Sequence, residues 1–506
     1  MSDLHTLGRW TSDRARRRPE AVAVVADGHE TTYAELDERA AALAARLVRA
    51  GYRTGDRLAT LTRSSTDHVV AFFACAKAGL VLVPLSWRLS AEELAHQLLH
   101  SRPALVLVEA PRADAARAAL ALLETVPPVE LLGRDGVEQH VPGPHRGDGA
   151  PALAQRPPRD DDPLLLVYTS GTGRTPKAVP LSHANCFWTN LSLAGVAPLT
   201  QDDVVLAVLP QFHVGGWNVQ PLLAWWHGAT VVVEGEFDAG RALGLLGRGV
   251  TTMMGVPTTY RLMAEHPGFA GTDLTGLTRV VTGGAAMPAD VLAAWTDRGV
   301  PVVQGYGLTE ASPNVLALEP ADAAGHPGSV GTPYPHVDVA VADPATGELL
   351  HGPARGELLV RGPAVFAGYF RDPDATAAVL RDGWLHTGDL VARDDAGYLS
   401  VVDRLGDMYV SGGENISPAE VEAVLAGHPA VAEVAVVGVP DRRWGEVGHA
   451  YVVPAAGHDL DAETLTAHCR AHLAAFKAPR TFSIVEALPR TPLHKVRRRS
   501  LREARR

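Results

Sequence analysis

Short apolar runs that alternate with amphipathic stretches constrain the fold of this chain more than any other feature. Residues 164–168 and 300–303 are apolar runs of the length that suits a buried strand. Helix-like stretches lie between such runs, and Ser90 with Glu93 has the capping-box spacing of a helix start. This alternation predicts an α/β fold in which helices cover largely parallel sheets.

The length of 506 residues exceeds what one compact core holds, so at least two domains are expected. Residues 394–397 suit a turn, 398–402 a short strand and 403–406 a linker, while Pro418 with Glu420 suits a new helix start. We therefore predict a large N-terminal domain of layered sheets and helices over 1–403, a hinge at 404–406, and a smaller, mobile α+β C-terminal domain over 407–506.

Bulk chemistry excludes several classes of protein. A net charge of −11 argues against a nucleic-acid surface, and no apolar run is long enough to span a membrane. Residues 1–18 lack the apolar stretch of a secretory signal. Cys75, Cys186 and Cys469 lie too far apart for a zinc site and suit buried filler positions. We expect a cytoplasmic protein, either a monomer or a homodimer, that acts on small molecules.

A loop rich in hydroxyls and glycines follows the strand-like run at 164–168. It contains Thr169, Ser170, Gly171, Thr172 and Lys177. Glycines let backbone N–H groups approach an anion, hydroxyls donate further hydrogen bonds, and lysine supplies charge. The loop lacks the spacing of a Walker motif, and taken alone it also suits a flexible turn.

Further polar turns lie later in the chain. Gln304, Gly305 and Tyr306, followed by Thr309 and Glu310, come directly after the apolar run at 300–303. Ligands bind at the carboxyl ends of strands in α/β folds, so this turn is a candidate site. The other candidate residues are Asp389, Arg404 and Lys495.

In this order, these segments resemble the superfamily of acyl-CoA synthetases, luciferases and peptide-synthetase adenylation domains. The resemblance covers nearly the whole chain. Residues 411–416, which contain Gly412 and Gly413, are similar to the version found in acyl- and aryl-CoA ligases. The resemblance implies an AMP-forming acid–CoA ligase that uses ATP, Mg²⁺ and coenzyme A.

The resemblance also implies roles for individual residues. The pyrophosphate end of ATP would be held by Thr169, Ser170, Gly171, Thr172 and Lys177. The adenine slot would be formed by Gly283, Gly284, Ala285, Gln304, Gly305 and Tyr306. Asp389 and Arg404 would bind the ribose, Thr309 would touch phosphate, and Glu310 with Thr172 would contact magnesium. Lys495 would bridge the substrate carboxylate and the α-phosphate, and Gly412 and Gly413 would line the pantetheine path.

The pair Phe212 and His213 has two interpretations. It could be a satisfied core pair, but its position matches the gate that the family places between the acid pocket and the ATP site, which we favour. Trp217 and Met287 also suit core positions, although Trp217 with Tyr306 could narrow the pocket into a flat slot. The segments 210–218 and 283–288 contain no Lys or Arg. We therefore expect a neutral acid, either aromatic, such as a cinnamate or benzoate, or of medium length and apolar.

Three residues depart from the family pattern and keep other functions open. Arg174 stands where the phosphate loop usually has glycine, Gly406 replaces the usual hinge residue, and His494 precedes Lys495 where glycine is usual. One alternative is a homologue with a changed second step, which diazotises an aryl amine with nitrite or stops at acyl-AMP. Another is an inactive binding protein, but the retained Glu310 and Lys495 argue against it.

Overall fold

The computed structural model describes residues 5–144, 155–169, 176–411, 414–416, 418–441, 445–473, 477–490 and 496–505. The chain divides into two compact units, of which the first comprises Met1–Val339 and Val360–Leu385 and the second Ala340–Leu359 and His386–Arg506. A larger N-terminal part of sheets and helices and a smaller C-terminal part are as predicted. A hinge at 404–406 stays a prediction, because a division into compact units does not report motion.

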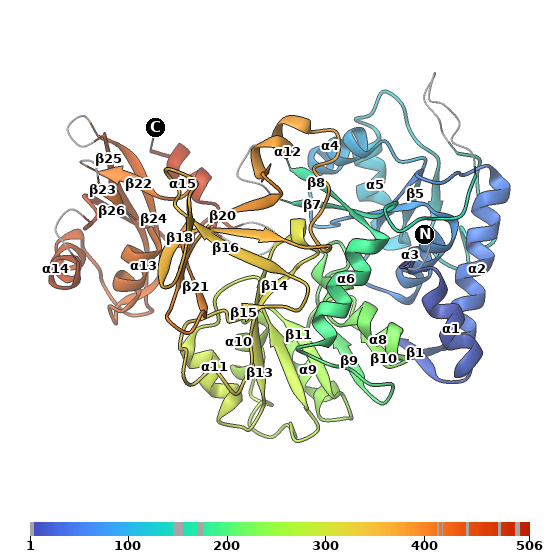
Figure 1. Cartoon of the computed structure of the whole chain (residues 1–506), viewed down its shortest axis with the longest axis horizontal. Coiled ribbons are helices and arrows are strands. Elements are labelled where there is room, and N and C mark those ends of the chain that lie inside the picture. Colours follow the sequence, from blue (N-terminus) through green and yellow to red (C-terminus); the bar gives the residue numbers. More distant parts are fainter. Residues whose placement is uncertain are drawn as a thin grey trace. The chain divides into compact units, whose positions relative to one another are not determined.

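The main sheet of the first unit has parallel central strands (Figure 1). Within the described residues its nine strands are, in spatial order, β15 (Thr332–Pro333), β14 (Asn314–Leu318), β13 (Val302–Gly307), β12 (Arg279–Thr282), β11 (Thr252–Gly255), β9 (Val204–Ala207), β10 (Thr230–Val233), β1 (Val22–Ala26) and β2 (His29–Thr32). The strands from β13 to β1 pair in parallel, whereas β14, β15 and β2 pair antiparallel at the two edges. The carboxyl ends of the parallel strands therefore meet at one edge of the sheet.

A second sheet in the same unit carries the strand that precedes the predicted phosphate loop. Its described strands are β6 (Val129–Leu131), β5 (Leu105–Val108), β3 (Arg57–Leu61), β4 (Val81–Leu85), β7 (Pro163–Thr169) and β8 (Lys177–Ser182). All neighbours pair in parallel except β7 and β8. The predicted strand at 164–168 is confirmed as the centre of β7.

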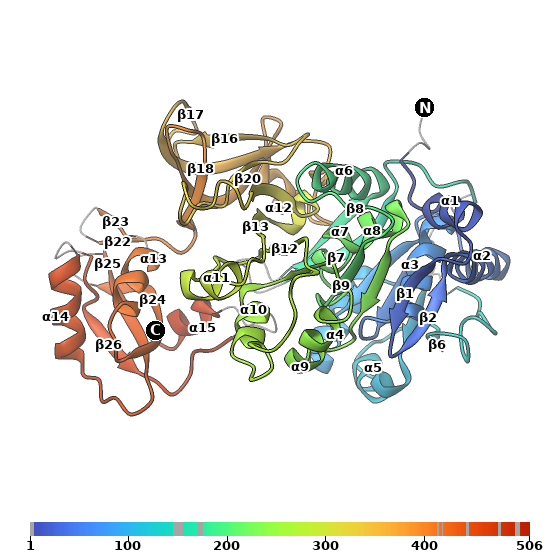
Figure 2. The same cartoon turned by 90° about the horizontal axis from the view of Figure 1, so that it is seen from below.

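The helices of the first unit follow the amphipathic stretches of the sequence. They are α1 (Arg9–Arg17), α2 (Tyr33–Ala50), α3 (Thr66–Ala78), α4 (Ala91–Ser101), α5 (Ala113–Leu120), α6 (His183–Ala194), α7 (Gly215–Asn218), α8 (Pro221–His227), α9 (Ala239–Leu246), α10 (Pro257–Ala264), α11 (Ala289–Thr296) and α12 (Pro373–Val379). Ser90 and Glu93 form the predicted capping box at α4. Helix α3 contacts strands of both sheets, and its side chains are buried on every face, as an apolar helix between two sheets requires (Figure 2).

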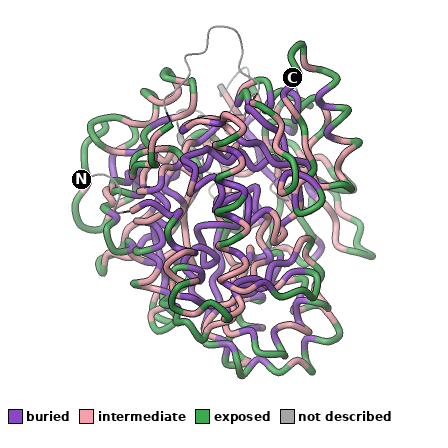
Figure 3. Tube along the Cα trace, turned by 90° about the vertical axis from the view of Figure 1, so that its right-hand side faces the viewer, coloured by how far each residue is buried: buried purple, intermediate pink, exposed green. Residues whose placement is uncertain are grey.

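Helices α9, α10 and α11 pack on the main sheet and form a hydrophobic core with it. Leu243, Tyr260, Met263 and Trp295 are buried there with strand residues such as Val280. Buried segments run through the interior, and exposed segments lie outside them (Figure 3). The three cysteines are free and buried, as expected.

A third sheet contains the strand that bears Asp389. In the described part of the chain it consists of β17 (Leu349–Leu350), β16 (Asp338–Ala342), β18 (Ala354–Arg361), β20 (Trp384–Arg393) and β19 (Leu380–Arg381), with β21 (Leu399–Arg404) paired to β20. The division into units passes through this sheet. The strand expected to end at residue 402 continues to Arg404, because Arg404 pairs in register with Asp389.

The fourth sheet belongs to the second unit. Its described strands are β23 (Glu414–Ile416), β22 (Tyr409–Ser411), β25 (Gly445–Pro454), β24 (Val431–Asp441) and β26 (Thr481–Ile484). Val436 faces helices α13 (Pro418–Ala426) and α14 (Ala462–His472), whereas Ala435 and Val437 face α15 (Arg498–Glu503). This alternation is the period of two expected of a strand covered on both faces.

No helix within these described ranges is both long and apolar enough to cross a lipid bilayer.

Candidate active site

The turns after β12 and β13 bring the predicted adenine-slot residues together. Thr282, the last residue of β12, pairs in register with Gln304 of β13. Gly283 follows directly and lies against the next residue of β13, since a Cβ on Gly283 would meet the Gly305 carbonyl oxygen at 3.0 Å. Gly284 and Ala285 are exposed beyond it. The two segments therefore form adjoining backbone turns at one edge of the sheet.

Thr309 and Glu310 lie in the short 3₁₀ helix η2 (Thr309–Ala311), which begins two residues after β13. The Leu308 N–H donates to the Pro313 carbonyl at 3.1 Å and closes this turn. Both Thr309 and Glu310 remain partly exposed. The chain therefore presents a hydroxyl and a carboxylate directly after a parallel strand.

Tyr369 connects Glu310 to Lys177, and the sequence motifs did not identify it. Its hydroxyl donates to Glu310 Oε1 at 2.7 Å, and Lys177 Nζ lies 4.6 Å from the centroid of its ring. Lys177 begins β8 and pairs with Thr169 at the end of β7. Three segments that are far apart in the sequence thus bring a cation, an aromatic ring and a carboxylate into contact.

The turn that carries His213 is fixed by its neighbours. The Gln211 N–H donates to Ser64 Oγ at 3.2 Å, and the Gln211 carbonyl accepts from the Trp217 indole N–H at 2.6 Å. Phe212 is buried and contacts the partly exposed His213 ring edge-on, with a centroid distance of 4.5 Å. This turn follows β9, so His213 lies at the edge where the other candidate residues lie.

Trp217 does not line a substrate slot, which corrects one of our expectations. Its side chain is fully buried and stacks on Phe72 at 4.5 Å. Because no part of the indole reaches the surface, it can offer no face to a ligand. The core interpretation of Trp217 is therefore correct, and its indole holds the Gln211 turn.

His68 supports the same turn from below. The ring is fully buried, its Nε2 lies 3.0 Å from Thr60 Oγ1, and it contacts the Trp217 ring edge-on with a centroid distance of 5.1 Å. Burial lowers the pKa of His68 to about 3, since an imidazolium would lose its hydration there. The imidazole of His68 is therefore neutral and lies close to the predicted gate of Phe212 and His213.

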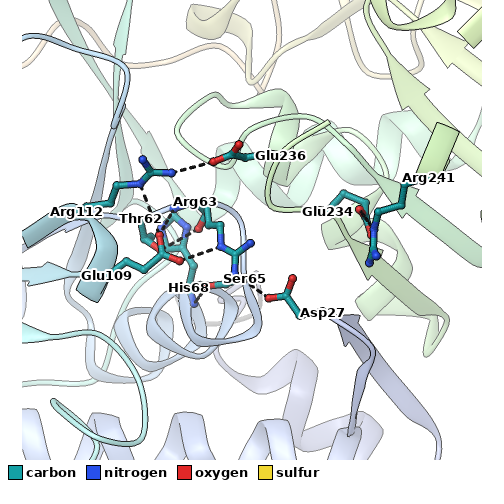
Figure 4. A network of polar contacts seen from close by, with 10 residues as sticks. All are labelled: Asp27, Thr62, Arg63, Ser65, His68, Glu109, Arg112, Glu234, Glu236 and Arg241. Carbon is teal, nitrogen blue, oxygen red and sulfur yellow. Dashed lines mark hydrogen bonds and ion pairs between the residues drawn. The ribbon is translucent and has the colours of Figure 1, made fainter. Parts of the chain in front are cut away.

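Side chains of alternating charge lie close together around Arg63 (Figure 4), the neighbour of Ser64, which accepts from the Gln211 N–H. We call these five residues the charge ladder: Asp27 after β1, Arg63 after β3, Glu109 after β5, Arg112 and Glu236. Arg63 pairs with Asp27 and Glu109, each at 2.9 Å, and Arg112 pairs with Glu236 at 2.8 Å. Glu236 follows β10, which is the neighbour of β9 in the sheet. The ladder therefore joins strand ends of both sheets of the first unit, and the charge of each arginine is already paired with a carboxylate.

Asp389 lies in the second unit and is held by several contacts. Arg404 Nε donates to Asp389 Oδ1 at 2.7 Å, and the Asp389 side chain is only 7% exposed. Glu357 accepts from the Gly388 N–H at 3.1 Å and lies 2.8 Å from His386 Nδ1, so it fixes the residues before Asp389. Asp389 and Arg404, which were both predicted to bind the ribose, therefore lie in direct contact, and their ribose role stays a prediction. Glu357, which the sequence motifs did not identify, holds the residues before Asp389.

Several predicted residues lie outside the described part of the chain. They are Ser170, Gly171, Thr172, Gly412, Gly413 and Lys495, together with the atypical Arg174 and His494. Their predicted roles stay predictions.

The described residues fit a magnesium ion that is bound largely by phosphate. Within the described ranges, no three His, Cys, Asp or Glu side chains gather as a protein-only metal site requires. Mg²⁺ usually takes one or two carboxylates, several waters and the oxygens of a nucleotide. Glu310, with one oxygen accepting from Tyr369, offers a carboxylate of this kind.

The fold places a cation, a hydroxyl and a carboxylate after the ends of strands, an arrangement typical of enzymes that bind nucleotides. The AMP-binding enzyme family matches residues 11–370, and the AMP-binding enzyme C-terminal domain matches residues 420–495. The chain therefore belongs to the AMP-binding enzyme family.

Similar proteins refine the assignment. The chain is 43% identical over 493 residues to a feruloyl-CoA synthase from Amycolatopsis sp, with 97% of each chain covered. It is 37% identical to an indoleacetate–CoA ligase from Aromatoleum aromaticum, with 98% of each covered. Among solved structures, ATP-bound MatB from Rhodopseudomonas palustris superimposes with a TM-score of 0.88 at 32% identity, covering 100% of this chain and 99% of that chain.

These findings confirm the acyl- and aryl-CoA ligase branch that the motifs indicated. The protein is an AMP-forming acid–CoA ligase whose substrates are a carboxylic acid, ATP and coenzyme A, with Mg²⁺ as cofactor.

Proposed function

We propose that the enzyme activates a neutral aryl acid of the hydroxycinnamate or arylacetate kind and transfers it to coenzyme A. In the first step the substrate carboxylate attacks the α-phosphorus of ATP and pyrophosphate leaves. In the second step the thiol of coenzyme A attacks the acyl-AMP carbonyl and AMP leaves. No protein nucleophile is needed, so catalysis consists of placement and charge neutralisation. The use of ATP and coenzyme A supports the predicted cytoplasmic location.

The residues act in this scheme as the resemblance implied. Lys177 and Thr169 would hold phosphate, and Glu310 would hold a magnesium ion, which would supply positive charge beside the leaving pyrophosphate. The turns at 283–285 and 304–306 hold the adenine. Asp389 and Arg404 bind the ribose, and Lys495 places the carboxylate against the α-phosphate. Gly412 and Gly413 line the pantetheine path.

One observation supports a neutral acid above all: each arginine of the charge ladder already forms an ion pair with a carboxylate of the ladder. Arg63 and Arg112 each pair with carboxylates, so a second substrate carboxylate that reached the ladder would have to displace Glu109 or Glu236. Arg88, whose guanidinium lies 5.9 Å from the centroid of the Phe212 ring, is exposed. The similarity to the feruloyl-CoA synthase and the indoleacetate–CoA ligase supports an aryl acid.

A panel of acids tests this proposal. Ferulate, indoleacetate, octanoate, malonate and o-succinylbenzoate are each supplied with ATP and Mg²⁺, and pyrophosphate release is measured. We expect ferulate or indoleacetate to have a kcat/KM at least about tenfold above that of both dicarboxylates, a preference worth 1.4 kcal/mol. A preference for malonate or o-succinylbenzoate would refute the neutral-acid proposal.

Two glutamates after β10 give a matched pair of variants. Glu236→Gln removes the shorter of two ion pairs of Arg112 and leaves the one to Glu109 at 3.9 Å, whereas Glu234→Gln removes the partner of Arg241, which is outside the ladder. We expect Glu236→Gln to raise the relative kcat/KM for the dicarboxylates by roughly fivefold, the equivalent of about 1 kcal/mol. Glu234→Gln should leave the preference unchanged.

A second candidate differs only in the acceptor of the acyl group. The chain is 37% identical to a fatty acid–[acyl-carrier-protein] ligase, ScoC, from Streptomyces coeruleorubidus, with 99% of this chain and 96% of that protein covered. The acyl-AMP is supplied with coenzyme A, with a carrier protein or with neither, and the products are identified by mass. This experiment separates transfer to coenzyme A from transfer to a carrier protein and from release of acyl-AMP. Nitrite with an aryl amine tests the diazotisation alternative in the same assay.

A further inference from the structure

Tyr369 contacts both Lys177 and Glu310, to which the proposed function assigns the binding of phosphate and of magnesium. Its hydroxyl donates to Glu310 Oε1 at 2.7 Å. Lys177 Nζ lies 4.6 Å from the centroid of the same ring, within the range of a cation–π contact. One side chain therefore holds the carboxylate through its hydroxyl and the ammonium through its face.

The segment that carries Tyr369 is anchored on both sides. The Tyr369 N–H donates to Thr376 Oγ1 in α12 at 2.9 Å, and the Phe366 N–H donates to the Glu310 carbonyl at 2.9 Å. The buried Phe366 ring contacts the Tyr369 ring edge-on, with a centroid distance of 4.9 Å. The ring therefore has a fixed position relative to the Glu310 backbone.

This geometry keeps two opposite charges apart while it fixes both. A direct salt bridge between Lys177 and Glu310 would neutralise each group and would have to break before phosphate and metal could bind. A phenol that donates to one carboxylate oxygen orients the carboxylate and leaves its second oxygen for a metal. An aromatic face holds an ammonium without removing its charge.

We propose that Tyr369 is a positioning residue for adenylation, which spaces Lys177 from Glu310 and orients each toward the magnesium–ATP complex. This inference rests on the proposed function, because it takes from it the roles of Lys177 and Glu310.

Two substitutions separate the two contacts. Tyr369→Phe keeps the ring beneath Lys177 and removes the hydroxyl from Glu310. It should raise the Mg²⁺ concentration for half-maximal pyrophosphate release about tenfold, as loss of an outer partner of a metal ligand does. Tyr369→Leu removes both contacts and should in addition raise the KM for ATP by about two- to fivefold, the worth of an exposed cation–π contact. Ferulate serves as the acid throughout.

Tyr33→Phe is the matched control for a lost phenol hydrogen bond. The Tyr33 hydroxyl donates to the Ala229 carbonyl at 2.6 Å, and the residue contacts neither Lys177 nor Glu310. This variant should keep the wild-type Mg²⁺ requirement even if its melting temperature falls. A Tyr369→Phe enzyme with the wild-type Mg²⁺ requirement would overturn the inference, and so would an equal change in the control.

Glu310→Gln distinguishes failure of this inference from failure of the proposed function. If Glu310→Gln keeps the wild-type Mg²⁺ requirement, the assignment of Glu310 to magnesium is wrong. If Glu310→Gln raises the requirement and Tyr369→Phe does not, the proposed function stands and only the role of Tyr369 is refuted.

Discussion

Replacing Gly307 by alanine tests whether the turn before Glu310 must keep its backbone position. Gly307 ends β13 opposite Asn314. A Cβ at this position would lie 1.8 Å from the Pro313 carbonyl oxygen, whereas real Cβ contacts stay beyond 3.0 Å. Both groups belong to paired main-chain segments, so the backbone must move by about 1.2 Å to relieve the clash.

The movement should appear as a loss of rate, because Thr309 and Glu310 follow within three residues. Misplacing catalytic groups by about 1 Å costs about a hundredfold in rate. We therefore expect Gly307→Ala to form acyl-AMP about a hundredfold more slowly, measured as acid-dependent pyrophosphate release.

Gly244→Ala is the control for this prediction. Gly244 lies in α9, and no atom lies within 4 Å of an added Cβ. The control should keep its rate and gain about 0.5–1 kcal/mol of stability, since alanine restricts the unfolded chain more than glycine does. A folded Gly307→Ala enzyme whose rate stays within about threefold of the wild type would refute the argument.

Three other perturbations test the predicted site and the fold. Asp389→Asn removes the charge that faces Arg404 and should weaken ATP binding at least about tenfold in a calorimetric titration, and unchanged affinity would contradict the ribose role. Lys495→Ala should slow acyl-AMP formation by roughly two to three orders of magnitude and spare thioester formation from synthetic acyl-AMP, and equal slowing of both steps would indicate a structural role. The depressed pKa of His68, about 3 against an ordinary 6.5, means that the unfolded chain binds a proton that the folded chain excludes. The stability of the folded protein should therefore fall as the pH drops below 6.5 toward 3. The melting temperature of His68→Gln should fall less between about pH 7 and pH 5 than that of the wild type. An equal fall in the two proteins would contradict this account.

Local patterns predicted those features whose causes are local. The capping box of Ser90 and Glu93 and the strand β7 were predictable because a cap depends on residues three apart and a buried strand on a continuous apolar run. The strand β21 extends beyond its predicted end because Arg404 pairs with Asp389, fifteen residues earlier in the chain. A prediction from a few neighbouring residues of the sequence cannot include a pairing partner that lies fifteen residues away.

The supporting residues of the site were not predictable for the same reason. Tyr369 lies 59 residues from Glu310, and Glu357 lies 29 residues from His386. Trp217 was misjudged because an aromatic residue beside the predicted gate suits a pocket wall as well as the core. Only the packing on Phe72 distinguishes the two, and that contact joins α3 and α7.

The carboxyl ends of the strands in the first unit form two chemical regions, which differ in the groups that contact their cations. At the ends of β1, β3, β5 and β10, Arg63 and Arg112 pair with carboxylates, so an anion that binds there must first break an ion pair. Next to β13 and β8, Lys177 rests on the Tyr369 ring, which leaves its charge intact and available to phosphate. Under the proposed function, the anionic nucleotide would bind beside Lys177 and the neutral acid beside the paired arginines. This difference between the two regions supports the proposal that the nucleotide and the acid bind at separate strand ends of the first unit and do not exchange places.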